Sequence, residues 1–129
     1  MLINGIINPH LLDLLSRIRH TNTVVIADAA FPYWPMIETV DLSLIRGIPS
    51  VLDVLGAILP NWKCGQVIMA EEFKAHNNAA TRNTFKRAFK GIPTTFEPHL
   101  EFKTRVPEAI GLIRTGDTTA YGNMILVSV

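Results

Sequence analysis

The sequence of 129 residues has little of several features that mark particular classes of protein. Its single cysteine, Cys64, excludes an internal disulfide and fits a reducing compartment. Twelve basic and eleven acidic residues give a net charge of +1 without a local Lys/Arg run. Nucleic acid and anionic lipid are therefore not expected partners. No apolar run reaches the roughly 18 residues of a membrane span, and residues 1–5 lack a basic signal-peptide segment. We expect a cytoplasmic protein that contacts no membrane.

Signatures of cofactor and metal chemistry are also missing. The sequence has no Gly-rich phosphate loop ending in Lys-Ser/Thr, no Gly-x-Gly-x-x-Gly and no Gly-x-Ser-x-Gly. Cys64 has no second cysteine to share a zinc ion, and the histidines are too scattered for metal-ligand spacing: His10, His20, His76 and His99. We expect neither a cofactor nor a metal.

Hydrophobic periodicity predicts helices and strands that alternate along a single domain, residues 1–129. We expect helices at 9–20, 49–59 and 77–90, a helical turn at 99–103, and strands at 23–27, 39–44, 66–70, 94–96, 110–114 and 123–129. This alternation predicts an α/β sandwich with a mainly parallel, Rossmann-like central sheet flanked by helices. The turn at 115–117 predicts a closing hairpin that adds an antiparallel strand at one edge. The terminal strand would then be an exposed apolar edge that a neighbouring subunit covers.

Polar side chains stand where the expected strands end. Asp28 follows the strand at 23–27, Glu71 and Glu72 follow the strand at 66–70, and His99 follows the strand at 94–96. The segment 121–123, Tyr-Gly-Asn, precedes the last strand. Ligands of open α/β sheets bind beyond the carboxyl ends of the strands. Acids, histidines, amides and phenols at such an edge bind hydroxyl groups and transfer protons without a cofactor.

Each of these residues also fits a purely structural role. Asp28 is well placed to cap a turn, and His20 to complement the dipole at a helix end. His99 and Lys103, four residues apart, share one helix face, and such a pair also fits a solvent-exposed surface without a site. Tyr121 also suits an ordinary hairpin turn. Aromatic residues after Asp28 are candidates to stack on a sugar: Phe31, Tyr33 and Trp34.

Five segments spread over nearly the whole chain carry a resemblance to a known family. They are Gly-Ile-Ile-Asn-Pro-His at 5–10, Val-Ile-Ala-Asp-Ala at 25–29, Asp-Leu-Ser-Leu with Gly-Ile-Pro at 41–49, His-Leu-Glu-Phe-Lys at 99–103, and Ile-Arg-Thr-Gly with Tyr-Gly-Asn at 113–123. In their order and spacing they resemble the ribose pyranase / fucose mutarotase family. Each segment alone is weak evidence for the family, and their order and spacing together are specific to it.

The resemblance implies a cofactor-free isomerase that interconverts pyranose and furanose forms, or α and β anomers, of a free monosaccharide. It also implies an α/β fold and closed homo-oligomeric rings, often decamers. By position, His20 matches the family's proton donor. The groups that hold the sugar hydroxyls match Asp28, His99, Lys103, Tyr121 and Asn123. Opening a hemiacetal needs one proton delivered to the ring oxygen and another removed from the anomeric hydroxyl, which suits a histidine and a carboxylate.

Two questions stay open at this point. The sequence mixes ribose-type features, at 41–44 and in the pair His99 and Lys103, with fucose-type features, at 121–123 and in the pair Phe31 and Pro32. Leu100 departs from the ribose-type pattern by replacing an acidic residue, and Tyr33 and Trp34 enlarge the loop after Asp28. The sugar is therefore undecided. The main alternative function is a non-catalytic sugar-binding or regulatory module that keeps the pocket, and a small structural subunit is a third reading.

Overall fold

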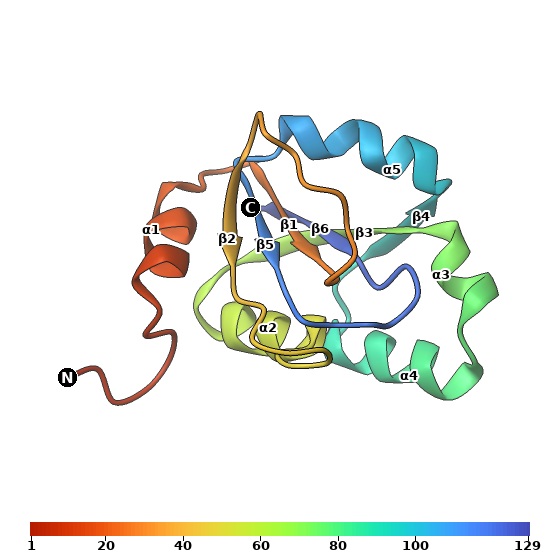
Figure 1. Cartoon of the computed structure of the whole chain (residues 1–129), viewed down its shortest axis with the longest axis horizontal. Coiled ribbons are helices and arrows are strands. Elements are labelled where there is room, and N and C mark those ends of the chain that lie inside the picture. Colours follow the sequence, from red (N-terminus) through yellow and green to blue (C-terminus); the bar gives the residue numbers. More distant parts are fainter.

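A computed structural model describes residues 1–129 as one mixed six-stranded sheet with helices on both faces (Figure 1). The helices are α1 Pro9–Arg17, α2 Val51–Ile58, α3 Glu71–His76, α4 Ala79–Ala88 and α5 His99–Arg105, with short 3-10 turns at Leu59–Asn61 and Val106–Glu108. The strands are β1 Thr23–Ala27, β2 Glu38–Asp41, β3 Cys64–Ala70, β4 Thr94–Glu97, β5 Gly111–Arg114 and β6 Met124–Ser128. None of the helices combines the length and the apolar character that crossing a bilayer requires.

Capping residues fix where the helices begin. The Asn8 side chain accepts a hydrogen bond from the Leu11 amide at 3.0 Å at the start of α1. Ser50 and Asp53 form a reciprocal capping box at the start of α2. Asn78 accepts from the backbone of α4 in the same way. Each cap satisfies backbone N–H groups that have no partner within the helix, so the sequence alone sets these boundaries.

The strand order is β2-β5-β1-β6-β3-β4. β5 runs parallel to both of its neighbours, β2 and β1, and β3 runs parallel to β4. β6 lies between β1 and β3 and is antiparallel to both, with Ile26 opposite Met124 and Met69 opposite the same residue. The sheet is thus two parallel halves joined by one central reversed strand.

Alternate residues of the buried strands point to opposite faces and build two apolar layers. Val24 and Ile26 of β1 pack with α1, α2 and α4 in a large cluster on one face. Val25 of the same strand packs with Phe102 and Val106 of the α5 region on the other face. Figure 1 shows α5 alone above the sheet and α1, α2 and α4 around its other side. Burying β1 on both faces holds the end of this strand, where Asp28 follows, in a rigid position.

The structure confirms the α/β class and a mainly parallel sheet, and it corrects two of the sequence expectations. The expected closing hairpin is wrong, because β5 pairs with β1 and β2 and does not contact β6 in the sheet. The expectation of an exposed terminal edge is also wrong: β6 is central, and the edges are β2 and β4. In addition, the expected helix at 77–90 is preceded by α3, which begins directly at Glu71 and breaks at Asn77.

Candidate functional site at the edge of the sheet

The reversed direction of β6 explains why distant parts of the sequence meet. The carboxyl ends of the parallel strands lie along one side of the sheet, at the ends of the strands. The amino end of the antiparallel strand β6 lies on the same side. Asp28 follows β1, His99 follows β4, and Asn123 precedes β6. The three side chains come together although about a hundred residues separate the first from the last.

A pocket of about 220 Å³ lies at this edge. The residues that line it are Asp28, Ala30, Phe31, Pro32, His99, Tyr121 and Asn123. Four of the six predicted site residues are among them. The volume lies below the range of about 300–1,000 Å³ typical of small-molecule sites, so one chain provides a shallow and open site.

Asp28 is held by the backbone of its own loop and by Asn123. The Asp28 amide donates to Asn123 Oδ1 at 2.7 Å, and the Ala30 amide donates to Asp28 Oδ1 at 3.1 Å. Burial raises the pKa of the Asp28 carboxyl, against the opposing effect of hydrogen bonds from Phe31, Ala30 and Asn123. The carboxylate is therefore a stronger base than a free aspartate, and it remains at the pocket wall with capacity to accept hydrogen bonds.

His99 is the first residue of α5, and its position is fixed by Glu72 and by aromatic packing. Its backbone amide donates to both carboxylate oxygens of Glu72, each at 3.1 Å. Its ring stacks on Phe102, with centroids 6.0 Å apart and an interplanar angle of 11°. Burial, with a further contribution from the Lys103 charge, lowers the pKa of His99. The Nδ1 atom is buried and has no hydrogen-bond partner in the chain, so the neutral imidazole keeps an unused polar atom beside the pocket.

Tyr121 stands between two histidines. Its ring centroid lies 5.1 Å from that of His99 in an edge-on arrangement and 5.0 Å from that of His76. The backbone of Tyr121 has a φ of 54°, in the left-handed region that is uncommon outside glycine. Strained backbone of this kind is often found at binding sites, where the surrounding structure holds it. Here it orients the phenol at the pocket wall, and His76 supports it from outside the pocket.

Comparison with known proteins identifies the family of this chain. The model of the RbsD / FucU transport protein family matches residues 1–129. The chain belongs to this family. It is 38% identical over 125 residues to the D-ribose pyranase of Geobacillus kaustophilus, a match covering 97% of this chain and 91% of that one. The D-ribose pyranase of Chromobacterium violaceum is also 38% identical over 125 residues, covering 97% of this chain and 95% of the relative.

Two solved structures share the fold of this chain. Bacillus subtilis RbsD complexed with D-ribose superimposes with a TM-score of 0.90 at 34% identity, over 99% of this chain and 97% of that one. The fucose mutarotase of Streptococcus pneumoniae in complex with L-fucose gives a TM-score of 0.79 at 20% identity, over 94% of this chain and 91% of that one. At that lower identity, the likeness concerns the fold alone.

His20, the expected proton donor, is not brought into the pocket by the fold of one chain. It lies in the exposed turn before β1, whereas Asp28 follows the same strand. The five residues of β1 separate His20 from Asp28. At about 3.3 Å per residue, the two side chains lie at opposite ends of the strand, roughly 17 Å apart or more. The turn is fixed by two bonds to β6, in which the Thr21 amide donates to Ser128 O at 3.0 Å and the Ser128 amide donates to Asn22 O at 2.9 Å.

Lys103 lies one turn after His99 on α5 and does not line the pocket. Its charge reaches the imidazole, because it is one of the causes of the lowered pKa of His99. Of the aromatic candidates, Phe31 lines the pocket. Tyr33 is exposed and Trp34 is half-buried, and neither lines the pocket. The structure thus brings together Asp28, His99, Tyr121 and Asn123, and leaves Lys103 at the periphery.

Arg114, at the end of β5, is a residue of the site that the sequence reasoning missed. Its guanidinium donates to the carbonyl oxygens of Ala29 at 3.2 Å, Phe31 at 2.6 Å and Pro32 at 3.3 Å. It also donates to Asp28 O at 3.3 Å. One side chain therefore holds residues 28–32, the part of the loop that forms one wall of the pocket. The available signal was a lone arginine directly after three buried strand residues, at the ligand-binding edge.

Proposed function

We propose that residues 1–129 act as one sugar mutarotase domain, an isomerase that interconverts the ring or anomeric forms of a free monosaccharide. The observation that carries this proposal is the convergence of a carboxylate, an imidazole, a phenol and an amide on one small pocket. These groups suit a neutral polyol, since they supply both donors and acceptors. The names of the relatives, D-ribose pyranase among them, support the same reaction.

The chemistry is general acid–base catalysis of hemiacetal opening and closure. A proton goes to the ring oxygen as the bond between this oxygen and the anomeric carbon breaks, and the anomeric hydroxyl loses its proton. The reverse step closes the ring through another hydroxyl or onto the other face. Asp28 is suited to accept a hydrogen bond from a sugar hydroxyl, and His99 is neutral and able to hold another hydroxyl. We propose no cofactor, since proton transfer between oxygen atoms needs only a side chain and water.

We propose D-ribose as the first substrate to test. The curated relatives named above, at 38% identity, are D-ribose pyranases, and the Bacillus subtilis neighbour, at 34% identity, is complexed with D-ribose. L-fucose is the second candidate, because the fold is shared with a fucose mutarotase. The shallow pocket suits a single sugar ring and not an oligosaccharide.

We further propose that His20 of a neighbouring copy completes the site as proton donor, within a closed homo-oligomeric ring, a decamer, in the cytoplasm. The pocket of one chain lacks His20, and the open side leaves room for a second subunit. Exposed apolar side chains beyond the pocket loops fit such an interface: Leu44, Ile45, Ile48 and Leu100. Cyclic symmetry gives every copy the same site and leaves no unpaired surface.

Saturation-transfer NMR tests the activity directly. Exchange between the pyranose and furanose signals of D-ribose, and between the anomers of L-fucose, should be faster with protein than in buffer. Adding EDTA should leave the rate unchanged. Heat-unfolded protein at the same concentration is the control for buffer catalysis. Absence of acceleration with any of a panel of aldoses, together with saturable sugar binding, would establish the binding-module function instead.

A further inference from the structure

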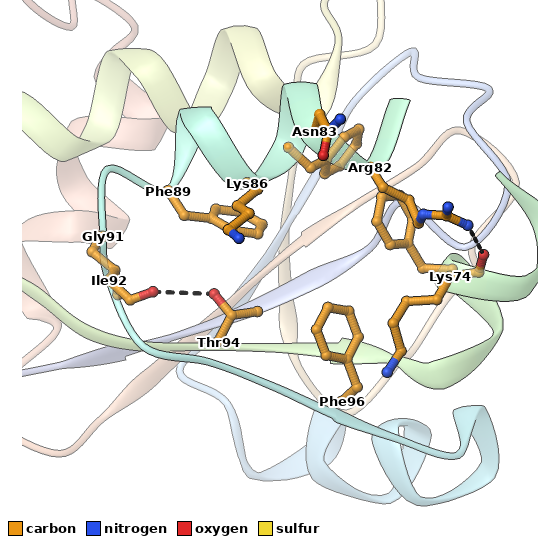
Figure 2. Close-up of a pocket in the computed structure, with 11 residues that line it drawn as sticks. Lys74, Arg82, Asn83, Lys86, Phe89, Gly91, Ile92, Thr94 and Phe96 are labelled. Atoms are coloured by element: carbon orange, nitrogen blue, oxygen red, sulfur yellow. Dashed lines mark hydrogen bonds between the residues drawn. The ribbon is translucent and has the colours of Figure 1, made fainter. Parts of the chain in front are cut away.

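A second and larger cavity lies between α4 and β4, and we call it the α4–β4 cavity (Figure 2). Its volume is about 520 Å³, within the usual range for small-molecule sites. None of its lining residues lines the sugar pocket. Sugar isomerisation as proposed above makes no use of it.

Aromatic rings form the inner surface of this cavity. Phe73 and Phe85 are almost fully buried at its base, with ring centroids 4.7 Å apart. Phe89, the residue directly after α4, lies next to Phe85, and Phe96 comes from β4 on the opposite side (Figure 2). Aromatic rings on two sides of a hollow favour a flat aromatic ligand, which packs against them. The rings therefore provide a place for a planar base.

Three cations and no carboxylate line the cavity. Lys74 Nζ lies 4.4 Å from the centroid of the Phe96 ring and is also paired with Glu71 at 3.2 Å. Arg82 is held in place because its guanidinium donates to Lys74 O at 2.9 Å (Figure 2) and to the carbonyl oxygen of residue 77. Lys86 is exposed and makes no ion pair in the chain. The cavity thus combines a positive rim with an aromatic interior.

Two neutral polar groups complete the lining. Asn83 presents an amide on the α4 side, and Thr94 presents a hydroxyl on the β4 side. The Thr94 hydroxyl donates to Ile92 O at 3.1 Å and so keeps its lone pairs for a ligand donor. These groups are suited to the hydroxyls of a sugar between a base and a charged group.

We propose that the α4–β4 cavity binds a nucleoside phosphate. The phenyl rings accept the base, Asn83 and Thr94 bind the ribose hydroxyls, and the cations Lys74, Arg82 and Lys86 neutralise the phosphate. Lys86 contributes most of the charge attraction, because Lys74 already shares a carboxylate and Arg82 already donates to two carbonyls. This site is independent of the sugar pocket and of the proposed isomerase activity.

Isothermal titration calorimetry of the full chain with AMP, UMP and adenosine tests the proposal. AMP or UMP should bind saturably, and adenosine should bind about tenfold more weakly or worse, because it lacks the phosphate. Lys86→Glu should weaken nucleotide binding by about tenfold or more. The matched control is Arg87→Glu, which makes the same charge reversal one residue further along α4, outside the cavity. It should change the affinity by less than about twofold.

Several outcomes would overturn the nucleotide site. The first is an absence of saturable binding of either nucleotide at millimolar concentration. The second is an equal loss of nucleotide affinity in Lys86→Glu and Arg87→Glu. The third is displacement of AMP by D-ribose, which would locate AMP in the sugar pocket. Phe96→Ala is a second probe, and it should weaken AMP binding while sugar exchange stays normal. If the unaltered chain does not bind AMP and the oligomer dissociates in Phe96→Ala, the cavity is a contact between copies of the chain. That result would also overturn the proposal.

Discussion

At the scale of single residues, the pocket brings together an aspartate and a histidine whose pKa values are shifted in opposite directions from those in solution. Burial raises the pKa of Asp28 and lowers the pKa of His99. For Asp28, burial destabilises the charged carboxylate, so its contribution to stability is present at acid pH and is lost as the pH rises through its folded pKa. For His99, burial destabilises the imidazolium, so stability is lost as the pH falls through its folded pKa.

The charge of Lys103 should be measurable at His99. In Lys103→Met the like charge is gone, so the pKa of His99 should rise toward its ordinary value while burial still holds it below. A pH titration of the histidine ring signals by NMR measures the shift. Lys63→Met, a substitution of a lysine outside the site, is the control and should leave His99 unchanged. An unchanged His99 pKa in Lys103→Met would mean that solvent screens the lysine completely.

His20 and Asp28 should differ in which kinetic quantity they control. His20→Ala should lower the ring-exchange rate by about 10²–10⁴-fold and leave sugar affinity nearly unchanged, since a proton donor acts in the transition state. Asp28→Ala should mainly weaken binding, because a hydroxyl acceptor also holds the ground state. Exchange rates at saturating and subsaturating D-ribose separate the two effects. His10→Ala is the matched histidine control outside the sugar pocket. Near-normal exchange in His20→Ala would remove His20 from the mechanism.

At the scale of elements, the loop after β1 depends on a residue of β5. Arg114 donates to four carbonyl oxygens of this loop, those of residues 28, 29, 31 and 32. The loop at 28–37 contains turns but no helix or strand, so these bonds hold it in place of a backbone ladder. The parallel pairing of β1 and β5, with Ala27 opposite Arg114, places the guanidinium beside the loop.

Removing this guanidinium should affect both stability and binding. In Arg114→Met the loop carbonyls lose their donor, so the free energy of unfolding should fall by about 1–3 kcal/mol. Sugar affinity should fall by about tenfold, because Asp28 and Phe31 lose their fixed position. Urea denaturation and NMR titration with D-ribose measure the two effects.

The control for Arg114→Met is Arg17→Met, which removes an exposed arginine paired with Asp13 and Glu38. An exposed pair of this kind is screened by solvent, contributes little to stability and lies outside the pocket. A stability loss in Arg114→Met with unchanged sugar affinity would show that Arg114 holds the fold but does not set the geometry of the site.

At the scale of the whole molecule, the separation of His20 from the pocket makes assembly a functional question. The two sit at opposite edges of the sheet, and the sheet is rigid because β1 is buried on both faces. A hinge within one chain would have to break this sheet to bring them together. A second subunit provides His20 without such a cost.

Complementation between inactive variants tests the shared site. His20→Ala and Tyr121→Ala should each be inactive, and refolding them together should restore exchange. In a ring with one site at each contact, random mixing at equal amounts leaves about a quarter of the sites with both residues intact. Light scattering should show an oligomer throughout. A monomer would exclude the ring, and an inactive mixed oligomer would place each site within one chain.

Much of this fold could be predicted from local patterns. Asn8 and Pro9 mark the start of α1, and the β-branched run at 23–27 forms β1, because caps and alternation act over a few residues. The family could be identified from five short segments, and the comparison confirmed it. Glu71 was predicted only to follow the strand at 66–70, and the structure places it in the first turn of α3.

The sequence by itself determined the strands, every helix except α3, and which polar residues follow the strands, since these depend on neighbours along the chain. The tertiary structure decided the position of β6 at the centre of the sheet, the contact of Arg114 with the loop after β1, and the separation of His20 from Asp28. These features depend on which strands pair. Pairing is chosen by burial of whole faces between segments far apart in sequence, and no local pattern records that choice.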